Sequence, residues 1–184
     1  MKILHLKKAK DGDIVALNQL LVQYKDFAFS IAFRICKNEQ DAEDVVQDSF
    51  IKVFKSIKQF RNESTFSTWL YRIIYNESIR VRKYRNQLIY TNINDNDEIV
   101  NYSCIDNALQ NILAAERKQI IRKALDQLHV NESLVLTLYY LNDKNMKEIH
   151  QITQLSRSNI KVILHRARKK LHTILKKMLA NKTE

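Results

Sequence analysis

Apolar residues recur every three or four positions along most of the chain, with polar residues between them. Such spacing places the apolar side chains on one face of a helix. Before residue 86 it predicts three helices, with a short extra turn at the start, that pack into a bundle of three to four helices. The second helix follows the interruption KNEQD, and the third begins near Ser64, which we expect to cap it. The residues predicted to face inward are Ile14, Leu17, Leu20, Leu21, Tyr24, Ala28, Ile31 and Ile35 in the first helix, Val46, Phe50, Val53, Phe54 and Ile57 in the second, and Phe66, Leu70, Ile74 and Val81 in the third.

The same periodicity returns after residue 115 and predicts two helices, with Asn131 as the cap of the second. The segment LNDKN then precedes a short helix, MKEIHQI, a polar turn, TQLS, and a long helix from Ser156. Two helices across a tight turn form a helix-turn-helix. We therefore predict an all-α chain with a four-helix carboxy-terminal domain. Its predicted inward positions are Ile120, Ile121, Ala124, Leu125, Leu128, Leu134, Leu136, Leu138, Tyr139 and Leu141, followed in the long helix by Ile160, Ile163, Leu164, Ala167, Leu171, Ile174, Leu175 and Met178.

The segment 86–115 is rich in Asn and Asp and has no sustained helical stripe before Ala108. It predicts a flexible linker between a first lobe, residues 1–85, and a second lobe, residues 116–184. The first lobe carries 16 basic and 10 acidic residues, the linker 0 and 4, and the second lobe 15 and 6. An acidic linker between two basic lobes could fold back on one of them and inhibit it, which is a hypothesis at this point.

Composition supports this architecture. The chain of 184 residues is long enough for two small domains, and with no Pro and one Gly it lacks the usual residues of tight β-turns. The cysteines, Cys36 and Cys104, have no metal-ligand spacing and are expected to be packing residues in a reducing compartment. We see no signal peptide and no apolar run of about 18 residues, so we expect a cytoplasmic protein. The net charge of +11 indicates a polyanionic partner, nucleic acid before membrane.

The long helix from Ser156 has a strongly basic outward face. No acidic residue lies between Arg157 and Lys177. A helix of this kind, preceded by a short helix and a turn, fits the major groove of DNA, where cations meet phosphates and leading residues meet base edges. The competing interpretation is a solvated basic face on a packing helix. The outward residues are Ser158, Lys161, Val162, His165, Arg166 and Lys169.

A second stripe lies beside the buried one on the third helix of the first lobe. It combines an aromatic ring, an amide and cations, which can stack on unpaired bases, bond their edges and hold the phosphates of a single strand. The preceding loop, FRNES, could supply a pocket. By itself a Trp on a helix is more often a core residue. The stripe consists of Trp69, Arg72, Asn76, Arg80 and Lys83.

The helix before it, DAEDVVQDSFIKVF, is acidic on its outward side. Acids early in a helix favour its dipole, so local helix stability is one explanation. Acids in a DNA-binding lobe would also repel phosphate, and we therefore expect this face to point away from DNA and to bind a protein. The outward residues are Asp41, Glu43, Asp44, Gln47 and Asp48.

These segments together resemble the extracytoplasmic-function group of the bacterial sigma-70 family, over roughly residues 13–85 and 116–175. The acidic helix resembles the segment that grips the clamp helices of the largest subunit of RNA polymerase. FRNESTFSTWLYRIIYN resembles the segment that melts and reads the minus-ten element. NMKEIHQITQLSRSNIKVILHRARKKL resembles the helix-turn-helix that reads the minus-thirty-five element.

The resemblance implies a promoter-recognition factor that binds core RNA polymerase and promoter DNA and starts transcription, with no cofactor, metal or catalytic residue. It adds an anti-sigma protein as a possible further partner. Position by position, it implies polymerase contacts at Asp41, Asp44, Gln47 and Asp48, capture of flipped bases by Phe60, Arg61, Trp69 and Asn76, and contact with the upstream element through Lys161, Val162, His165 and Arg166, with Arg157 and Ser158 near its backbone.

The chain departs from the family at three places. The family commonly has Leu-Pro where this chain has Leu128 and His129, and a Gly in the turn where it has Gln154. It also commonly has Pro-x-Gly at the start of the recognition helix, where this chain reads SRS from Ser156. Because Ser156 can cap the helix directly, the fold is compatible with these changes.

Two other classes of function compete with this one. An ordinary helix-turn-helix regulator would bind duplex operators alone, usually as a dimer. A metal-dependent nuclease could use the clustered acids Asp41, Asp44 and Asp48, but these lack a His or carboxylate partner at ligand spacing. The acidic helix followed by WLYRI argues for the polymerase-dependent function.

Overall fold

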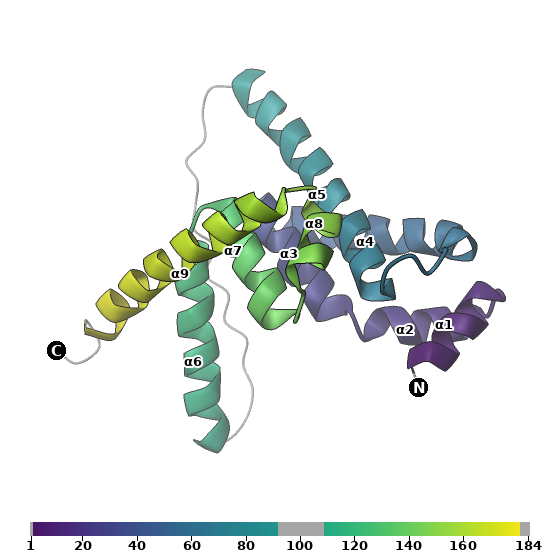
Figure 1. The fold of residues 1–184 in the computed structure, drawn as a ribbon, viewed down its shortest axis with the longest axis horizontal. Coiled ribbons are helices and arrows are strands. Elements are labelled where there is room, and N and C mark those ends of the chain that lie inside the picture. Colours follow the sequence, from purple (N-terminus) through teal and green to yellow (C-terminus); the bar gives the residue numbers. More distant parts are fainter. Residues whose placement is uncertain (1, 92–108, 181–184) are drawn as a thin grey trace.

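The computed structural model describes residues 2–91 and 109–180, with side chains for 5–87, 116–117 and 119–180, and its described elements are all helical (Figure 1). The amino-terminal lobe and the carboxy-terminal lobe are both present as predicted. The first lobe contains α1 (Lys2–Lys10), α2 (Ile14–Val22), α3 (Lys25–Cys36), α4 (Glu39–Ser56), the short turn η1 (Ile57–Gln59) and α5 (Phe66–Thr91); the second contains α6 (Leu109–Asp126), α7 (Val130–Leu136), the π-helical turn η2 (Thr137–Leu141), α8 (Met146–Thr153) and α9 (Arg157–Ala180).

The first predicted helix is two helices, α2 and α3, that meet at Gln23 and Tyr24. The extra turn at the start is a full helix, α1, which packs against α2 and buries Ala9. The helices α1 and α2 form a hairpin. Asp13 caps α2, so Ile14 is the first residue of that helix and lies at the end of the hairpin, where it is 61% exposed. The prediction that Ile14 faces the core is therefore wrong.

The helices α3, α4 and α5 form the core of the first lobe, with Ile31, Ile35, Leu70 and Ile74 fully buried. One predicted inward residue of α4 does not join them: Phe54 is 44% exposed, because it lies on the side of α4 that faces the α2 hairpin and not α5.

Two further side chains cap helices of this lobe. Asn38 begins α4, where its Oδ1 accepts a hydrogen bond from the backbone N–H of Asp41 at 2.9 Å. Thr65, and not Ser64, caps α5, because its Oγ1 accepts from the N–H of Thr68 at 3.3 Å. The cap and the start of the helix therefore lie one residue later than predicted.

The predicted inward stripe of the second lobe faces its core. Half of these residues are buried and most of the others are half-buried; Ile121 and Leu141 are the exposed members, at 43% and 47%, and face a groove between the lobes. Asn131 is not the cap of α7. That helix already begins at Val130, and the carboxylate of Glu132 accepts a hydrogen bond from the backbone N–H of His129.

The helix-turn-helix forms as predicted from α8 and α9. Asn145 caps α8, and the Oγ of Ser156 caps α9 by accepting from the N–H of Asn159 at 3.2 Å. Gln154 ends α8 in the left-handed conformation, with φ of 62°. This is the position where the family commonly has Gly, the residue that adopts such a conformation at least cost.

The helices flanking the predicted linker are longer than the sequence indicated. α5 continues to Thr91 and α6 begins at Leu109, so both enter the segment 86–115. Cys36 is buried, as expected of a packing residue, whereas Cys104 lies outside the described residues. No helix in the described ranges is apolar and long enough to cross a bilayer.

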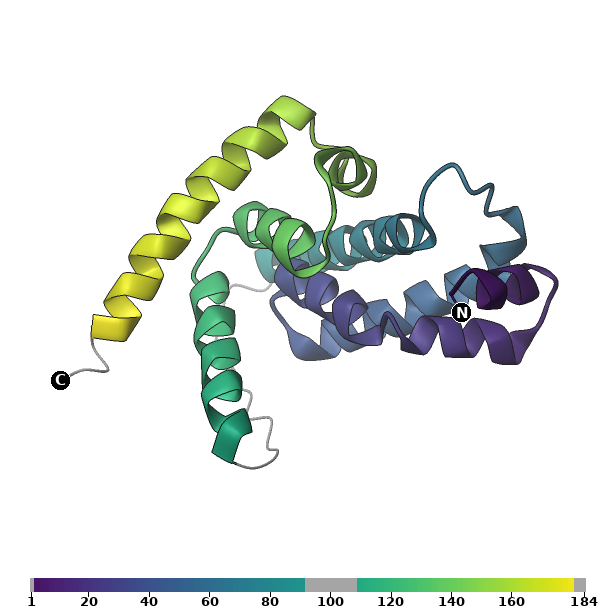
Figure 2. The ribbon, with the colours of Figure 1, turned by 60° about the horizontal axis from the view of Figure 1, so that its bottom comes forward.

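The two lobes touch each other. The first helix of the helix-turn-helix, α8, packs on α5, and α7 packs on α3, so that the buried apolar side chains of both lobes form one cluster. Figure 2 shows the second lobe at one end of the first, with the α1–α2 hairpin at the opposite end.

Candidate nucleic-acid interface

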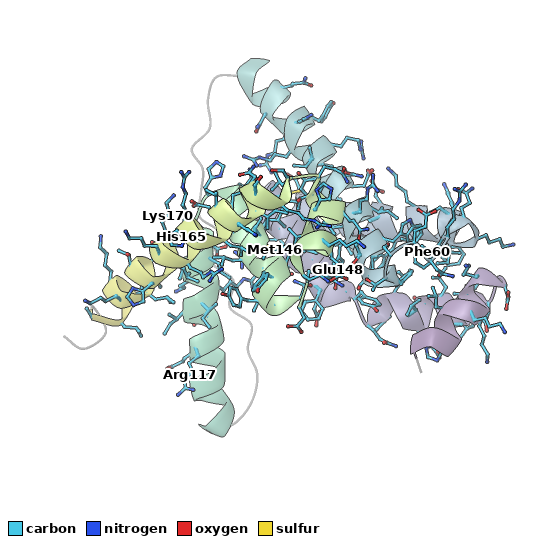
Figure 3. The ribbon with its side chains drawn as sticks, viewed as in Figure 1. Phe60, Arg117, Met146, Glu148, His165 and Lys170 are labelled. Carbon is cyan, nitrogen blue, oxygen red and sulfur yellow. The ribbon has the colours of Figure 1, made fainter. Side chains whose placement is uncertain are left out.

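The outward face of α9 is the basic surface that the sequence predicted. Ile160, Leu164 and Ala167 are buried on the inner side, while the predicted DNA-facing residues all lie exposed. Figure 3 shows His165 and Lys170 on this helix, away from the first lobe. The exposed set is Arg157, Ser158, Lys161, Val162, His165, Arg166 and Lys169.

The electrostatics of this face suit a polyanion. The nearest acid of α7, Glu132, accepts a hydrogen bond from the Nζ of Lys170 at 2.7 Å and is nearly buried. Its negative charge is therefore neutralised behind the exposed face. The leading end of α9 also presents backbone N–H groups that favour negative charge.

The aromatic stripe of α5 begins in a cluster of rings. The ring of Trp69 lies 5.0 Å from that of Phe60 and 5.9 Å from that of Phe66, measured between centroids. Phe60 is 5% exposed, and the Nζ of Lys10 lies over its ring, 5.8 Å from the centroid. The resemblance predicted that Phe60 captures a base, but in this arrangement Phe60 is buried and its ring packs against that of Trp69. Trp69 is half-buried, so part of its side chain remains exposed to solvent.

The remaining members of the stripe, Arg72, Asn76, Arg80 and Lys83, are exposed along α5, and Arg61 is exposed in the preceding loop. Their spacing of three or four residues keeps them in one row on the helix. A row of cations and an amide beside a ring can follow the backbone of a single strand while bases stack at Trp69.

A buried acid positions part of this row. Glu77, on the inner side of α5, accepts hydrogen bonds from Lys52 of α4 and from the Nε of Arg80, the latter at 3.0 Å. Burial alone would raise the pKa of Glu77, but the hydrogen bonds and charges of Lys52 and Arg80 outweigh it and hold that pKa below its ordinary value. Glu77 is therefore ionised at neutral pH and keeps Arg80 in place.

The acidic stripe of α4 borders the cationic stripe of α5. Asp44, Gln47 and Asp48 are exposed, as predicted for a docking surface. Asp41, however, is half-buried, and its Oδ2 lies 2.5 Å from Nη1 of Arg85. The expectation that the acidic face points away from the DNA-binding row is therefore too simple, because the two surfaces share an edge along α4 and α5.

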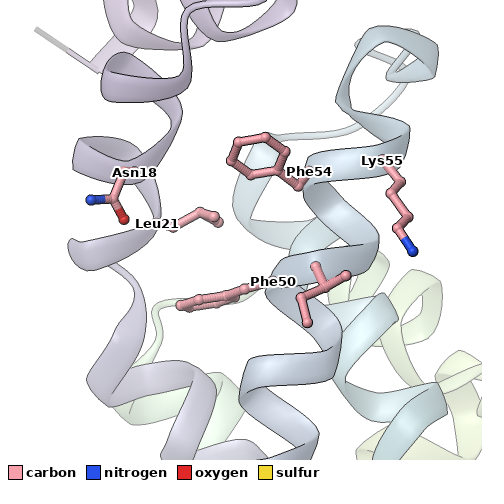
Figure 4. Close-up of a pocket in the computed structure, with 6 residues that line it drawn as sticks. Asn18, Leu21, Phe50, Phe54 and Lys55 are labelled. Atoms are coloured by element: carbon pink, nitrogen blue, oxygen red, sulfur yellow. The ribbon is translucent and has the colours of Figure 1, made fainter.

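The sequence analysis missed an apolar pocket that continues the acidic stripe. Phe50, Ile51 and Phe54 of α4 line it with Leu21 and Asn18 of α2, around a volume of about 340 Å³ (Figure 4). Ile51 and Phe54 are 52% and 44% exposed. The one feature of the sequence that could have indicated this pocket is Ile51, an apolar residue outside the predicted inward stripe. Protein interfaces commonly join an apolar centre to a polar rim, which is what the pocket and the acids together provide.

A larger groove of about 970 Å³ lies between the lobes. Its walls are α3 and α4 on one side and α6 on the other, and it includes Gln47, Phe33 and Arg122. The guanidinium of Arg122 lies over the ring of Phe33 at 5.5 Å from its centroid. Within residues 2–91 and 109–180, no group of three or more His, Cys, Asp or Glu side chains could hold a metal ion.

Comparison with known proteins gives two family matches in the order of the two lobes. The model of Sigma-70 region 2 matches residues 20–87, and the model of Sigma-70, region 4, matches residues 118–171. The first match contains α3, α4 and most of α5, and the second contains the helix-turn-helix. Both therefore fall on the surfaces described above.

Similar curated proteins cover nearly the whole chain. The ECF RNA polymerase sigma factor SigW of Bacillus subtilis is 29% identical over 177 residues, which is 93% of this chain and 95% of that protein. The ECF RNA polymerase sigma-E factor of Haemophilus influenzae is 26% identical over 180 residues, 95% of each. The sigma-E factor of Escherichia coli K12 is 28% identical over 169 residues, 89% of this chain and 88% of that protein.

Solved structures share the fold. The sigma factor RpoE in complex with the anti-sigma factor NepR from Bartonella quintana has a TM-score of 0.72 at 21% identity, covering 86% of this chain and 96% of that chain. CnrH in complex with the cytosolic domain of CnrY has a TM-score of 0.63 at 21% identity, covering 94% and 96%.

Proposed function

The chain belongs to the extracytoplasmic-function group of the sigma-70 family, and we propose that it directs core RNA polymerase to specific promoters through three separate surfaces. One observation carries the proposal: the region 2 lobe presents an acidic stripe and an aromatic-cationic stripe side by side, while the region 4 lobe presents a basic recognition helix. A stand-alone operator-binding regulator has no evident use for the first two surfaces.

The second lobe reads duplex DNA at the minus-thirty-five element. The first three turns of α9 present Lys161, Val162, His165 and Arg166, where a helix in the major groove meets base edges. Arg157, Ser158 and Lys169 contact the phosphate backbone on either side. Because the phosphate contacts are electrostatic, this part of the binding weakens as the salt concentration rises.

The first lobe captures the unpaired minus-ten strand. Trp69 stacks on a base with its ring held by Phe60, and Arg61, exposed in the loop before α5, contributes a further cation. Asn76 bonds a base edge, while Arg72, Arg80 and Lys83 hold the phosphates. Stacking contributes about 1–3 kcal/mol per base, so a few captured bases offset strand opening without nucleotide hydrolysis. The chain needs no catalytic group of its own for this step.

The polymerase docks on α4. Cationic or polar groups of the partner meet Asp44, Gln47 and Asp48, and Asp41 extends this acidic stripe. An apolar centre beside the stripe is supplied by Ile51 and Phe54. Docking sets the distance between the two lobes. A flexible connection raises the effective concentration of the second binding event only when both sites are held at a fitting span, which the polymerase provides.

The groove between the lobes and the relatives solved with anti-sigma factors support an anti-sigma protein as a third partner. We also place the chain in the cytoplasm, where polymerase and DNA are found.

Run-off transcription tests the function without knowledge of the promoter sequence. Core polymerase, genomic DNA fragments and the purified chain are combined, and the 5′ ends of the transcripts are mapped. The proposal predicts a discrete set of start sites that appear only with the chain, each preceded by shared elements near minus ten and minus thirty-five. A helix-turn-helix regulator would instead yield no transcripts with core polymerase alone and would change transcription only in the presence of another sigma factor.

A further inference from the structure

The helix α1 places a lysine next to the aromatic cluster of the first lobe. The Nζ of Lys10 lies 5.8 Å from the centroid of the Phe60 ring, and the centroids of Phe60 and Trp69 are 5.0 Å apart. These two distances place the Lys10 ammonium within about 11 Å of the Trp69 ring. Figure 3 shows Phe60 between the end of α4 and the α1–α2 hairpin. A cation of α1 therefore lies close to the ring on which, by the proposed function, a base stacks.

The position of α1 is fixed by its connection to α2. Gly12 has φ of 100°, a left-handed conformation that glycine adopts at least cost. Its N–H donates to the carbonyl of Ala9 at 3.1 Å, and the N–H of Asp13 donates to the carbonyl of Lys8 at 3.0 Å. The side chain of Ala9 is buried where α1 packs against α2. The lysines of α1 are therefore carried by a positioned helix.

Two further lysines extend the positive charge from Lys10. Lys7 precedes Lys10 by three residues, so the two side chains are neighbours on α1. Lys58 is exposed on η1, which packs against α1. Among the described residues, no acid forms an ion pair with any of the three. We call Lys7, Lys10 and Lys58 the α1 patch.

Acids near the α1 patch leave its lysines unpaired. Asp13 accepts the capping hydrogen bond of α2 at 2.9 Å. Asp11 and Glu63 are exposed, and within the described structure neither lies in an ion pair. In the cationic row of α5, by contrast, Arg80 is paired with Glu77. The α1 patch therefore offers unpaired cations to an anionic partner.

The location of the α1 patch fits a strand that continues past Trp69. The row from Arg72 to Lys83 leads away from the ring cluster along α5, whereas the α1 patch adjoins that cluster at the amino-terminal end of α5. One strand of DNA advances about 3.4 Å for each nucleotide in a duplex and further when extended, so 11 Å corresponds to at most about three nucleotides. Lysines on an exposed helix are commonly solvated without a partner. What distinguishes these is their place at the end of a strand-binding surface.

We propose that the α1 patch binds the phosphates of the single DNA strand next to the bases captured at Trp69. The strand-binding surface then continues from α5 across η1 onto α1. This inference rests on the proposed function, because it assigns base capture to Trp69. A lysine ammonium holds phosphate as a point charge and reads no base edge, so the patch raises affinity for any sequence.

A double variant and a matched control test the patch. Lys7→Gln with Lys58→Gln removes two of its cations and leaves Lys10 on the Phe60 ring. The control, Lys25→Gln with Lys123→Gln, removes the same charge from exposed positions outside the row and the patch. Circular dichroism and thermal melting establish that both variants fold.

The basic face of α9 would also bind a single strand through its phosphates. The parent, the double variant and the control therefore all carry Lys161→Gln, Arg166→Gln and Lys169→Gln, three exposed positions of that face. In this background the first lobe supplies most of the remaining affinity for single-stranded DNA.

Fluorescence anisotropy with a labelled oligodeoxythymidine of about 15 nucleotides measures the affinity between about 50 and 200 mM salt. For single strands, each phosphate contact contributes about 0.7 to the slope of log affinity against log salt. The slope of the double variant should be smaller than that of the parent by about 1.4, with binding at least about fivefold weaker at 50 mM salt, while the control keeps the parental slope. Equal slopes in the parent and the double variant, or an equal fall in the control, would overturn the proposal.

Photocrosslinking locates the strand in the complex with core polymerase. A photoreactive group is attached to Lys7→Cys, or separately to Lys83→Cys, in a Cys104→Ser background in which Cys36 is buried. On a promoter mapped by run-off transcription, we expect both groups to react with the non-template strand, on opposite sides of the captured minus-ten bases. Reaction of the Lys7→Cys group only with polymerase subunits or with duplex DNA would contradict the assignment.

The anisotropy measurement needs neither polymerase nor a promoter, so the two proposals fail separately. A chain that shows the predicted difference in slope but starts no transcripts with core polymerase refutes the proposed function and retains the patch as a single-strand surface. A chain that transcribes, but whose double variant keeps the parental slope, refutes only the role of the α1 patch.

Discussion

The Nη2 atom of Arg80 lies 3.8 Å from Oδ2 of Asp48, so the cationic row of α5 and the acidic stripe of α4 meet edge to edge. Both side chains are more than half exposed, and such an ion pair contributes at most about 1 kcal/mol to stability. Loss of this ion pair would therefore change the two neighbouring surfaces more than it would change the stability of the fold. A change at Asp48 also alters the surroundings of Arg80, and Asp44 is the cleaner position for testing polymerase docking alone.

Phe54→Ala should weaken the binding of core polymerase. Large aromatic residues in interface pockets commonly contribute about 2 kcal/mol or more, so we expect a loss of affinity of roughly tenfold or greater with a small change in melting temperature. Fluorescence anisotropy of the labelled chain titrated with core polymerase measures it. The control, Tyr140→Ala, removes an aromatic side chain that is 52% exposed on the second lobe and should bind as the parent does. Equal losses of affinity in both variants would show that the pocket is not part of the surface that binds polymerase.

The stability of the first lobe should fall in acid because of Glu77. The pKa of this carboxyl is lowered in the folded chain, so its ionised form stabilises the fold above the ordinary pKa near 4.5 and this contribution disappears as the pH falls through the folded value. Glu77→Gln should cost about 1–3 kcal/mol at pH 7 and show a flatter decline below pH 4.5. Urea unfolding between pH 3 and pH 7 measures both. Glu63→Gln, an exposed acid in the loop, should keep the steep decline of the parent.

Gln154→Gly should stabilise the helix-turn-helix. Gln154 has φ of 62°, a conformation that costs a side-chain-bearing residue about 1 kcal/mol and glycine almost nothing. We expect the urea midpoint to rise by an amount equivalent to about 1 kcal/mol, with an unchanged dependence on urea concentration. The opposite change is expected for Gln151→Gly, three residues earlier within α8, because glycine destabilises a helix interior. A lower midpoint for Gln154→Gly would show that another contact of Gln154 outweighs the backbone effect.

The Cys36 thiol should be almost inert in the folded chain. Burial raises its pKa to about 11, so at pH 8 only about one thiol in a thousand is the reactive thiolate. In a Cys104→Ser variant, reaction with an aromatic disulfide reagent should be at least about a hundredfold slower in buffer than in denaturing urea. Rapid modification in buffer would mean that the lobe opens around α3 far more often than its packing indicates.

Periodicity predicted the surfaces that depend on one helix. The spacing of Ile160, Leu164 and Ala167 fixes the inner side of α9, so the outward position of Lys161 and His165 follows from helical geometry. The same holds for the row on α5. No assumption about neighbouring helices was needed in either case.

Features that depend on two helices could not be predicted in this way. Phe54 fits the inward stripe of α4 by spacing, yet the α2 hairpin does not cover it fully. Phe60 lies in a loop, and its burial depends on rings contributed by α5. The pair of Arg34 and Asp126 is separated by 92 residues, and helical periodicity carries no information about such a contact.

Equilibrium binding to core polymerase by two variants of the first lobe tests the division of its surface most directly. Asp44→Lys reverses a charge on the acidic stripe and should lose at least about tenfold in affinity for core polymerase. Trp69→Ala should bind core polymerase as the parent does, within about twofold, but should fail to open promoters in run-off transcription. If Trp69→Ala lost polymerase affinity as severely as Asp44→Lys, or if Asp44→Lys bound normally, the two stripes would not have the separate roles proposed for them.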